Sequence, residues 1–141
     1  MIKTKFTEMF GVKYPIIQSG MQWLGVPEFA SVVCNAGGMG TINTSCWDTP
    51  EELREALEHM NTLTSKPYIV NISITPGLAP DLELMAGRTA CKMFFENGDV
   101  ENCGVICIGQ TGGLIHEVLS VKDVIDGMMA ECKSTLAKFD F

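Results

Sequence analysis

Positive charge is scarce in this sequence, and no segment gathers it. Ten Lys and Arg side chains stand against seventeen Asp and Glu side chains, so the 141 residues carry a formal net charge of −7. Surfaces that bind nucleic acid or anionic membranes need clustered Lys and Arg. The composition therefore excludes nucleic acid and membrane as partners, and we expect a small-molecule substrate or a protein partner.

Long apolar runs and paired cysteines are also lacking. No run approaches the ~20 apolar residues that cross a bilayer, and the mixed residues after Met1 do not form the apolar region of a secretory signal. The six cysteines lie among apolar residues without C-x-x-C spacing, which indicates buried, reduced thiols in a cytoplasmic protein. Because the chain has two histidines, His59 and His116, packing explains Cys103 and Cys107 better than a metal site does. We expect no metal.

Strand and helix patterns alternate through the first half of the chain. The apolar run from Tyr14 to Gln18 predicts a buried strand, and apolar residues at helical spacing predict a helix from Pro27 that ends at Gly37-Gly38. Met39 to Asn43 predicts a second strand. Thr49-Pro50-Glu51-Glu52 predicts a capping box with proline at the first helical position. The predicted buried stripe of that second helix comprises Leu53, Ala56, Leu57 and Met60.

The alternation continues in the second half. Tyr68 to Thr75 predicts a third strand in which apolar residues alternate with polar ones, and a polar face on an otherwise buried strand indicates that it lines a site. A third helix is expected from about Leu82 to Gly98, and a short fourth strand from Val105 to Ile108. A last helix begins at Ser120. Its predicted buried stripe comprises Val121, Val124, Ile125, Met128, Met129, Cys132 and Leu136.

This order of elements indicates an α/β protein built from parallel, right-handed βα units. The units predict a partial (β/α) barrel-like parallel sheet of three to four strands with flanking helices. A closed eight-stranded barrel is excluded for one copy of the chain, because eight βα units need ~200 residues or more. We expect residues 1–141 to form a single domain.

Motifs in two parts of the chain resemble those of a flavoenzyme family. Residues 14–21, Tyr-Pro-Ile-Ile-Gln-Ser-Gly-Met, and residues 35–40, Asn-Ala-Gly-Gly-Met-Gly, are similar to the opening motif of the nitronate monooxygenases, formerly called 2-nitropropane dioxygenases. The likeness covers residues 1–80. It resumes over residues 87–141, which resemble the C-terminal tail of the family. The family also includes FMN-dependent enoyl-acyl-carrier-protein reductases.

The resemblance implies a cofactor and a reaction, and it indicates which parts of the family are missing from this chain. Only Pro76 to Ala86 lies between the two similar blocks, where the family has most of a (β/α)₈ barrel, its catalytic histidine in a Glu-Ala-Gly-Gly-His-like motif and the loops that hold the FMN phosphate. Neither motif occurs in this sequence. We therefore assign no catalytic residue and expect FMN to bind weakly or not at all. The implied reaction is oxidation of an alkyl nitronate with dioxygen to a carbonyl compound and nitrite, absent or impaired in this chain.

By resemblance, five residues contact the flavin ring, namely Gln18, Ser19, Gly20, Met21 and Asn71. The first four follow the first strand, where α/β proteins bind ligands, and Gly20 permits a close approach; a plain turn is the alternative. Asn71 matches an asparagine of the family that hydrogen-bonds the flavin. Because burying its amide unpaired costs about 1–3 kcal/mol, Asn71 needs a partner, and the local backbone is the alternative one.

Two glycine clusters have structural explanations. Gly37, Gly38 and Gly40 follow a helix, whereas phosphate loops precede one, so these glycines are interpreted as a helix cap. Gly109 to Gly113 follows a possible strand, yet the resemblance places it in the tail of the family, which disfavours a phosphate role. For Trp23 and Trp47, in βα loops, a substrate pocket and packing over the strand ends both stay open.

Three functional hypotheses follow. The first is an FMN-dependent oxidoreductase of the nitronate monooxygenase type, with descent from the enoyl reductases as a variant. The second is a non-catalytic α/β module that forms a homo-oligomer through its open sheet, because such a sheet leaves unpaired edges. The third is a deletion product of marginal stability.

Overall fold

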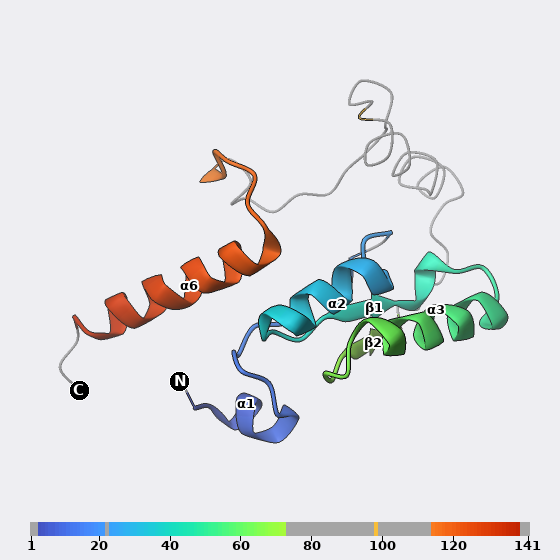
Figure 1. Ribbon diagram of the computed structural model, residues 1–141, viewed down its shortest axis with the longest axis horizontal. Helices are drawn as coiled ribbons and strands as arrows, with labels where there is room; N and C mark the ends of the chain where they lie inside the picture. The colour runs from blue at the N-terminus through green and yellow to red at the C-terminus, as the bar shows by residue number, and fades with distance from the viewer. Residues whose placement is uncertain (1–2, 22, 73–97, 99–113, 139–141) are drawn as a thin grey trace. The chain divides into compact units, whose positions relative to one another are not determined.

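The computed structural model describes residues 3–21, 23–72, 98 and 114–138 (Figure 1). The chain divides into two compact units, residues 1–73 with 119–141 and residues 74–118. All the described helices and strands belong to the first unit. In chain order they are α1 (Lys5–Phe10), α2 (Pro27–Ala36), β1 (Thr41–Asn43), the 3₁₀ turn η1 (Thr44–Cys46), α3 (Pro50–Leu63), β2 (Ile69–Asn71) and α6 (Val121–Leu136).

Helix α2 begins and ends where the sequence predicts. Pro27 occupies the first turn, where a missing N–H costs nothing. At the other end Gly37 adopts the left-handed conformation with φ 104°. The N–H of Gly37 donates to the carbonyl of Cys34 at 3.0 Å, and that of Gly38 donates to the carbonyl of Val33 at 3.1 Å. The interpretation of these glycines as a helix cap is confirmed.

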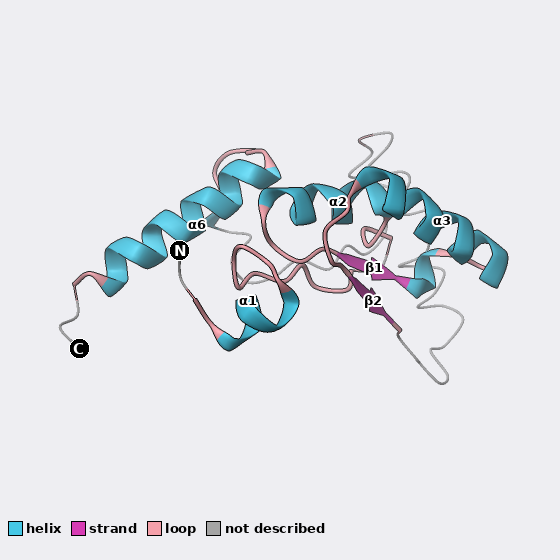
Figure 2. Ribbon diagram, turned by 60° about the horizontal axis from the view of Figure 1, so that its bottom comes forward, coloured by secondary structure: helices cyan, strands magenta, loops and turns pink. Residues whose placement is uncertain are grey.

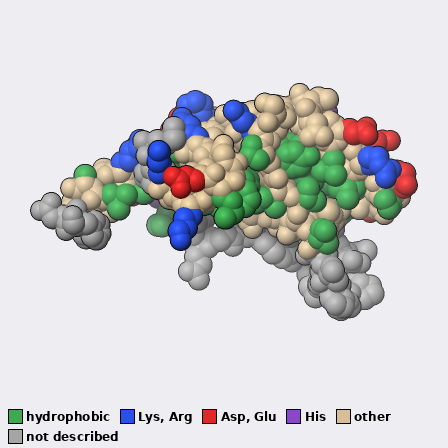
Figure 3. Space-filling model, turned by 90° about the horizontal axis from the view of Figure 1, so that it is seen from below, with side chains coloured by type: hydrophobic (Ala, Val, Ile, Leu, Met, Phe, Trp, Pro, Cys, Tyr) green, Lys and Arg blue, Asp and Glu red, His purple; other side chains and the backbone are tan. Residues whose placement is uncertain are grey.

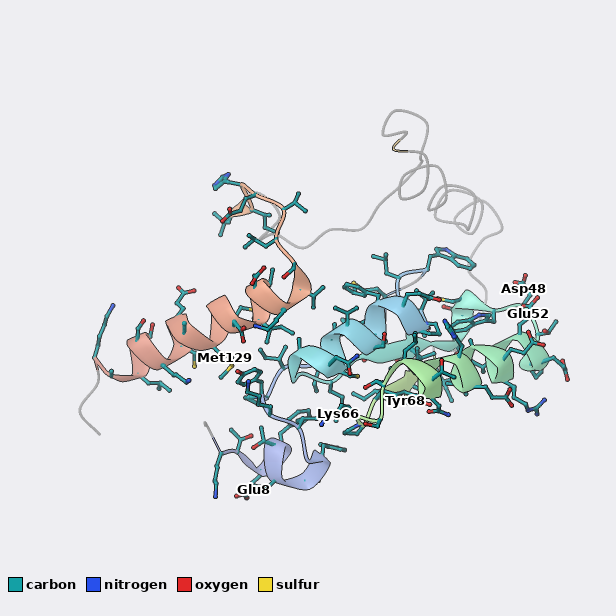
Figure 4. The ribbon with its side chains drawn as sticks, in the orientation of Figure 1. Glu8, Asp48, Glu52, Lys66, Tyr68 and Met129 are labelled. Atoms are coloured by element: carbon teal, nitrogen blue, oxygen red, sulfur yellow. The ribbon has the colours of Figure 1, made fainter. Side chains whose placement is uncertain are left out.

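Helix α3 also follows its sequence signals, with one change at the cap. Thr49 accepts the N–H of Glu52 at 3.2 Å, as a capping box requires. The Glu52 carboxylate, however, accepts the N–H of Asp48 at 2.9 Å rather than that of Thr49 (Figure 4). The predicted stripe is confirmed, since Ala56 and Met60 are buried and the two leucines pack beside them.

One helix was not predicted. In α1 the Thr4 hydroxyl accepts the N–H of Thr7 at 3.1 Å, and the Thr7 hydroxyl accepts the N–H of Thr4 at 3.0 Å. Gly11 then ends the helix with φ 67°. The signal was present as a Thr-x-x-Thr box, in which a second threonine replaces the usual Glu or Gln.

The sheet is small, parallel and open. β1 pairs with β2 in the register Thr41↔Ile69 and Asn43↔Asn71, and the two strands lie side by side in Figure 2. This confirms the α/β class and the parallel sheet, while the count of three to four strands stays a prediction. Val70 and Ile72 are 40% and 71% exposed, so the apolar face of β2 is not buried as expected.

The segment from Tyr14 to Gln18 is not a strand, and that prediction is wrong. It forms one isolated parallel bridge, Ile17↔Met39, with Met39 N–H donating to the Ile16 carbonyl at 2.9 Å. Pro15 has no N–H to continue a ladder, and the chain bends through residues 13–15. The segment nevertheless lies beside the N-terminal side of β1, parallel to it.

Two hydrophobic clusters flank α2. One contains the buried residues Ala30, Cys34, Ile42 and Met60, with Trp47, Leu53, Leu57 and Tyr68 packed against them. The other contains Tyr14, Val33, Ile125 and Met129, with Ile16, Ala36 and Val121 packed against them. Helix α2 therefore contributes to both clusters, and it joins the sheet to α3 and α6.

Helix α6 starts at the predicted cap, where the Ser120 hydroxyl accepts the N–H of Asp123 at 3.1 Å. Its predicted stripe is buried only in part. Ile125 and Met129 are buried, whereas Met128 is 53% exposed and Leu136 is 48% exposed. Only one short stretch of α6 faces the cluster around Val33, so the remaining stripe has no cover from the described residues.

Thiol positions differ from the prediction at one site. Cys34 and Cys46 are buried, as expected, but Cys132 is exposed. The other three cysteines, the predicted third helix, the predicted fourth strand and the Gly109–Gly113 turn lie outside the described residues. Within the described ranges, no helix is long and apolar enough to pass through a bilayer.

Candidate functional site

Three amide side chains lie where the parallel segments end. Gln18 follows the Ile17 bridge, Asn43 ends β1 and Asn71 ends β2, directly opposite Asn43 in the register. Ligands of open α/β sheets bind beyond the carboxyl ends of the strands. We call Gln18, Asn43 and Asn71, together with Gly20 and Gly25, the amide edge.

Gln18 is 8% exposed and is hydrogen-bonded to Thr41 of β1 and to Met39. Its Nε2 donates to the Thr41 carbonyl at 3.2 Å, and its Oε1 accepts the Thr41 N–H at 3.3 Å. The backbone N–H of Gln18 donates to the Met39 carbonyl at 2.9 Å, and its carbonyl accepts the Thr41 hydroxyl at 2.5 Å. The Gln18 side chain thus makes the two hydrogen bonds to Thr41 that a backbone strand would otherwise make. It thereby fixes the position at which residues 19–21 begin.

Gly20 and Asn71 are in close contact. A Cβ atom built on Gly20 would lie 2.6 Å from both Cγ and Nδ2 of Asn71. The bare backbone of Gly20 therefore lies against the Asn71 carboxamide, and a larger residue would displace it. The sequence predicted a close approach at Gly20; the structure shows that the neighbour within the chain is Asn71.

Asn71 has the partner that its burial requires, and that partner is a side chain. Its Nδ2 donates to Oδ1 of Asn43 at 3.4 Å. From the sequence, the flavin and the local backbone were the expected partners of Asn71, and Asn43 was not predicted. Asn43 is 3% exposed, and its own N–H donates to the Gly25 carbonyl at 2.9 Å. A polar residue at the end of a buried strand was the signal that could have found it.

The loop after Gln18 is tied to Asn43 through Gly25. A Cβ on Gly25 would lie 2.7 Å from the Cβ of Asn43, and the Gly25 N–H donates to the Met21 carbonyl at 2.9 Å. Ser19 is exposed and Met21 is partly buried. Within this loop Trp23 has φ 61°, a strained conformation of a kind that gathers at ligand sites.

Two hollows of the described surface lie away from the amide edge. A groove of about 510 Å³ adjoins the C-terminal end of α2, lined by Gly11, Val12, Lys13, Cys34, Asn35, Ala36, Gly37, Gly38, Lys66, Pro67, Lys122 and Asp126. The hydrogen bond with Asp126 raises the pKa of Lys122 and lowers that of the carboxyl. Lys13, Lys66 and Lys122 complement the negative, C-terminal end of the α2 dipole. Their position in this groove therefore has an explanation that needs no ligand.

The second hollow, of about 400 Å³, lies beside α2 and α3 and includes Trp47 and His59. His59 lies on α3, as predicted, and its Nε2 is 3.2 Å from Oε1 of Glu28. Both side chains of this pair are about half exposed or more, so the contact contributes little to stability. Trp47 packs against the cluster around Met60.

The Cys34 thiol is buried at the C-terminal end of α2 and has a perturbed pKa. Burial raises the pKa of the Cys34 thiol, and the Gly40 N–H, which donates to its Sγ at 3.2 Å, opposes that rise. The thiol also lies 3.5 Å from the Pro67 carbonyl. These contacts make Cys34 a buried packing residue. Within the described residues, no group of three His, Cys, Asp or Glu side chains could hold a metal ion.

The amide edge consists of uncharged groups. Gly20 contributes bare backbone, and Asn71 contributes a carboxamide at the same edge. The basic side chains Lys13, Lys66 and Lys122 instead line the groove at the C-terminal end of α2. The five residues of the amide edge include no positively charged side chain, the kind of group that makes charge-assisted contacts to a phosphate.

Comparison with known proteins agrees with this geometry. Residues 3–94, which contain the whole amide edge, match the model of the nitronate monooxygenase family. The chain belongs to the nitronate monooxygenase family. The match accounts for the opening motif, although it neither tests the role of any single residue nor extends to α6.

Individual relatives are similar over about half of this chain. A "probable nitronate monooxygenase" of Staphylococcus saprophyticus is 38% identical over 73 residues, which are 52% of this chain and 20% of that protein. A (3aS,4S,5R,7aS)-5-hydroxy-7a-methyl-1-oxo-octahydro-1H-indene-4-carboxyl-CoA dehydrogenase of Rhodococcus jostii is 39% identical over 79 residues, 56% of this chain and 22% of its own length. The structure of FabK from Thermotoga maritima is 34% identical over 54% of this chain and 24% of that one, with a TM-score of 0.48. The aligned part of this chain thus spans about a fifth to a quarter of these relatives.

Proposed function

We propose that this chain carries a flavin-ring site of an FMN-dependent oxidoreductase, formed by Gln18, Ser19, Gly20, Met21 and Asn71. The observation that carries the proposal is the contact of Gly20 with the Asn71 carboxamide at the carboxyl ends of parallel strands. Membership of the nitronate monooxygenase family supports it, because the matched residues 3–94 include all five of these residues.

The proposed role of each residue follows from its contacts. FMN would supply the oxidation chemistry, which for this family is the conversion of an alkyl nitronate with dioxygen to a carbonyl compound and nitrite. Gln18 would hold the loop in register through Thr41. Gly20 would let the Asn71 carboxamide lie against its bare backbone, and Asn71 would orient the ring by a hydrogen bond.

We also propose that this chain alone is inactive or impaired. His59 lies on α3, where its Nε2 contacts Glu28, and the catalytic histidine motif of the family does not occur in this sequence. Without charge-assisted phosphate contacts, FMN would keep mainly its ring contacts, and we expect a Kd at least about a hundredfold weaker than a full site would give.

A flavin titration tests both proposals. Fluorescence quenching of FMN and of lumiflavin, which lacks the ribityl phosphate, should give dissociation constants within about threefold of each other, because the ring carries the contacts. Asn71→Ala should abolish most of that binding, whereas Asn35→Ala, on the outer end of α2, should not. Tight FMN binding with consumption of propionate 3-nitronate by the wild type would refute the proposed impairment. Equal binding by Asn71→Ala and the wild type would refute the site.

Exposed apolar side chains favour the second hypothesis, a non-catalytic α/β module that forms a homo-oligomer. Ile17, Val70 and Ile72 are 51%, 40% and 71% exposed near the small open sheet, and Figure 3 shows hydrophobic side chains on the face seen from below. Apolar side chains beside a strand edge favour pairing with another copy. Light scattering after size exclusion decides the point, and a well-folded monomer at high concentration would contradict self-association.

A further inference from the structure

The hydrogen bonds at the amide edge determine which atom of Asn71 faces outward. The backbone N–H of Ser45 donates to the side chain of Asn43 at 3.3 Å. A backbone N–H can only donate, so the Asn43 atom that it meets is the carboxamide oxygen and not the nitrogen. Asn43 is 3% exposed and its own N–H is bound to the Gly25 carbonyl, so this oxygen stays in place.

The same oxygen then sets the orientation of Asn71. It lies 3.4 Å from the Asn71 carboxamide nitrogen, which donates to it. Turning the Asn71 amide over would bring two carbonyl oxygens together and lose that hydrogen bond. Among the hydrogen bonds between described residues, the Asn71 oxygen takes none, and Gly20 covers the flat face of the amide near Cγ and Nδ2.

We propose that Asn43 is a positioning residue, which holds Asn71 so that its carboxamide oxygen is offered to the ligand. The amide edge would then select a flat ring that donates an N–H, such as the imide N–H of a flavin, over a ring that is alkylated at that nitrogen. The choice of a flavin rests on the proposed function, whereas the orientation of Asn71 does not.

The orientation is tested without ligand by NMR of the full chain. In the wild type the Asn71 side-chain amide protons should show one hydrogen-bonded proton with a small temperature coefficient. Asn43→Ala should abolish that signature, and Asn43→Asp, which keeps an accepting oxygen, should retain it. Backbone amide spectra report whether each variant is folded. A wild-type Asn71 amide with two solvent-like protons would overturn the proposal, whether or not any flavin binds.

Selectivity is tested with lumiflavin and N3-methyl-lumiflavin. The wild type should bind lumiflavin roughly tenfold more tightly, the effect of about one hydrogen bond. Asn43→Ala should reduce this ratio below about threefold while Asn43→Asp keeps it. Asn35→Ala is a matched control, because Asn35 also makes two side-chain hydrogen bonds, to Leu63 and Thr64, on another part of the unit. Equal binding of both rings by the wild type, or an unchanged ratio in Asn43→Ala, would overturn the proposal. Absence of all flavin binding would refute the proposed function instead, and the Asn71 resonances would still decide the orientation.

Discussion

Gly40 offers a sharp test of the packing of β1 on α2. A Cβ atom at this position would lie 2.1 Å from the carbonyl oxygen of Ala30 and 2.8 Å from its Cα. These are backbone atoms of a helix, so no side chain can rotate out of the way. Gly40 is itself fixed on both sides, because its N–H donates to Cys34 and its carbonyl accepts the N–H of Ile69 at 2.9 Å.

Gly40→Ala should therefore be strongly destabilising. Overpacking of a filled interior costs about 1–3 kcal/mol, and the rigid neighbour puts this substitution at about 3 kcal/mol. For a domain of this size, such a loss lowers Tm by roughly 10 °C. Gly127→Ala is the matched control, since a Cβ there meets nothing within 4 Å and lies in the interior of α6. Alanine is the better helix former, so this control should gain about 0.5–1 kcal/mol.

Urea unfolding followed by circular dichroism measures both changes. Should Gly40→Ala fold too poorly alone, the double variant with Gly127→Ala provides a measurable baseline, because the two sites are far apart in sequence and share no contact. Gly40→Ala with the midpoint of the wild type, or two variants that shift in the same direction, would refute the packing described here.

Three further predictions concern other parts of the unit. Gln18→Ala leaves the N–H and carbonyl of Thr41 unpaired and should lower the free energy of unfolding in urea by about 2 kcal/mol. An unchanged free energy would show that these two hydrogen bonds do not stabilise the fold. Ile125→Ala should cost about 2–4 kcal/mol because Ile125 is buried against α2, whereas Met128→Ala on the exposed side should change stability by less than about 0.5 kcal/mol; equal effects would argue against docking of α6. In site-resolved alkylation, Cys132 should react at once and Cys34 only on opening, since burial both hides Cys34 and raises its pKa; equal rates would contradict its burial. Because the pKa of Cys34 is raised in the folded chain, the unfolded chain loses the thiol proton at a lower pH than the folded chain does. The stability that Cys34 contributes is therefore lost as the pH rises above 9.0, the ordinary pKa of the thiol.

Local signals in the sequence were enough to place the starts of α2, α3 and α6, although α1 was missed. Pro27 and Gly37 bound α2, Thr49 caps α3 and Ser120 caps α6, as expected from residues within one turn of each end. Such caps act on backbone groups a few residues away, so they can be predicted without knowledge of the fold. The family was accessible for a similar reason, since its opening motif is one continuous stretch.

Pairing and burial were decided by residues far apart in the chain. Asn43 and Asn71 meet because β1 and β2 pair in a particular register, and no property of either segment specifies that register. Apolar residues of α6 that share a stripe in the sequence differ in burial, because Ile125 and Met129 are buried in the cluster with Val33 of α2, whereas Met128 and Leu136 are exposed. The sequence by itself therefore determined the helix ends, the α/β class and the family. Only the tertiary structure decided that the amides form one edge, because hydrogen bonds and contacts across 28 residues depend on how the chain returns upon itself.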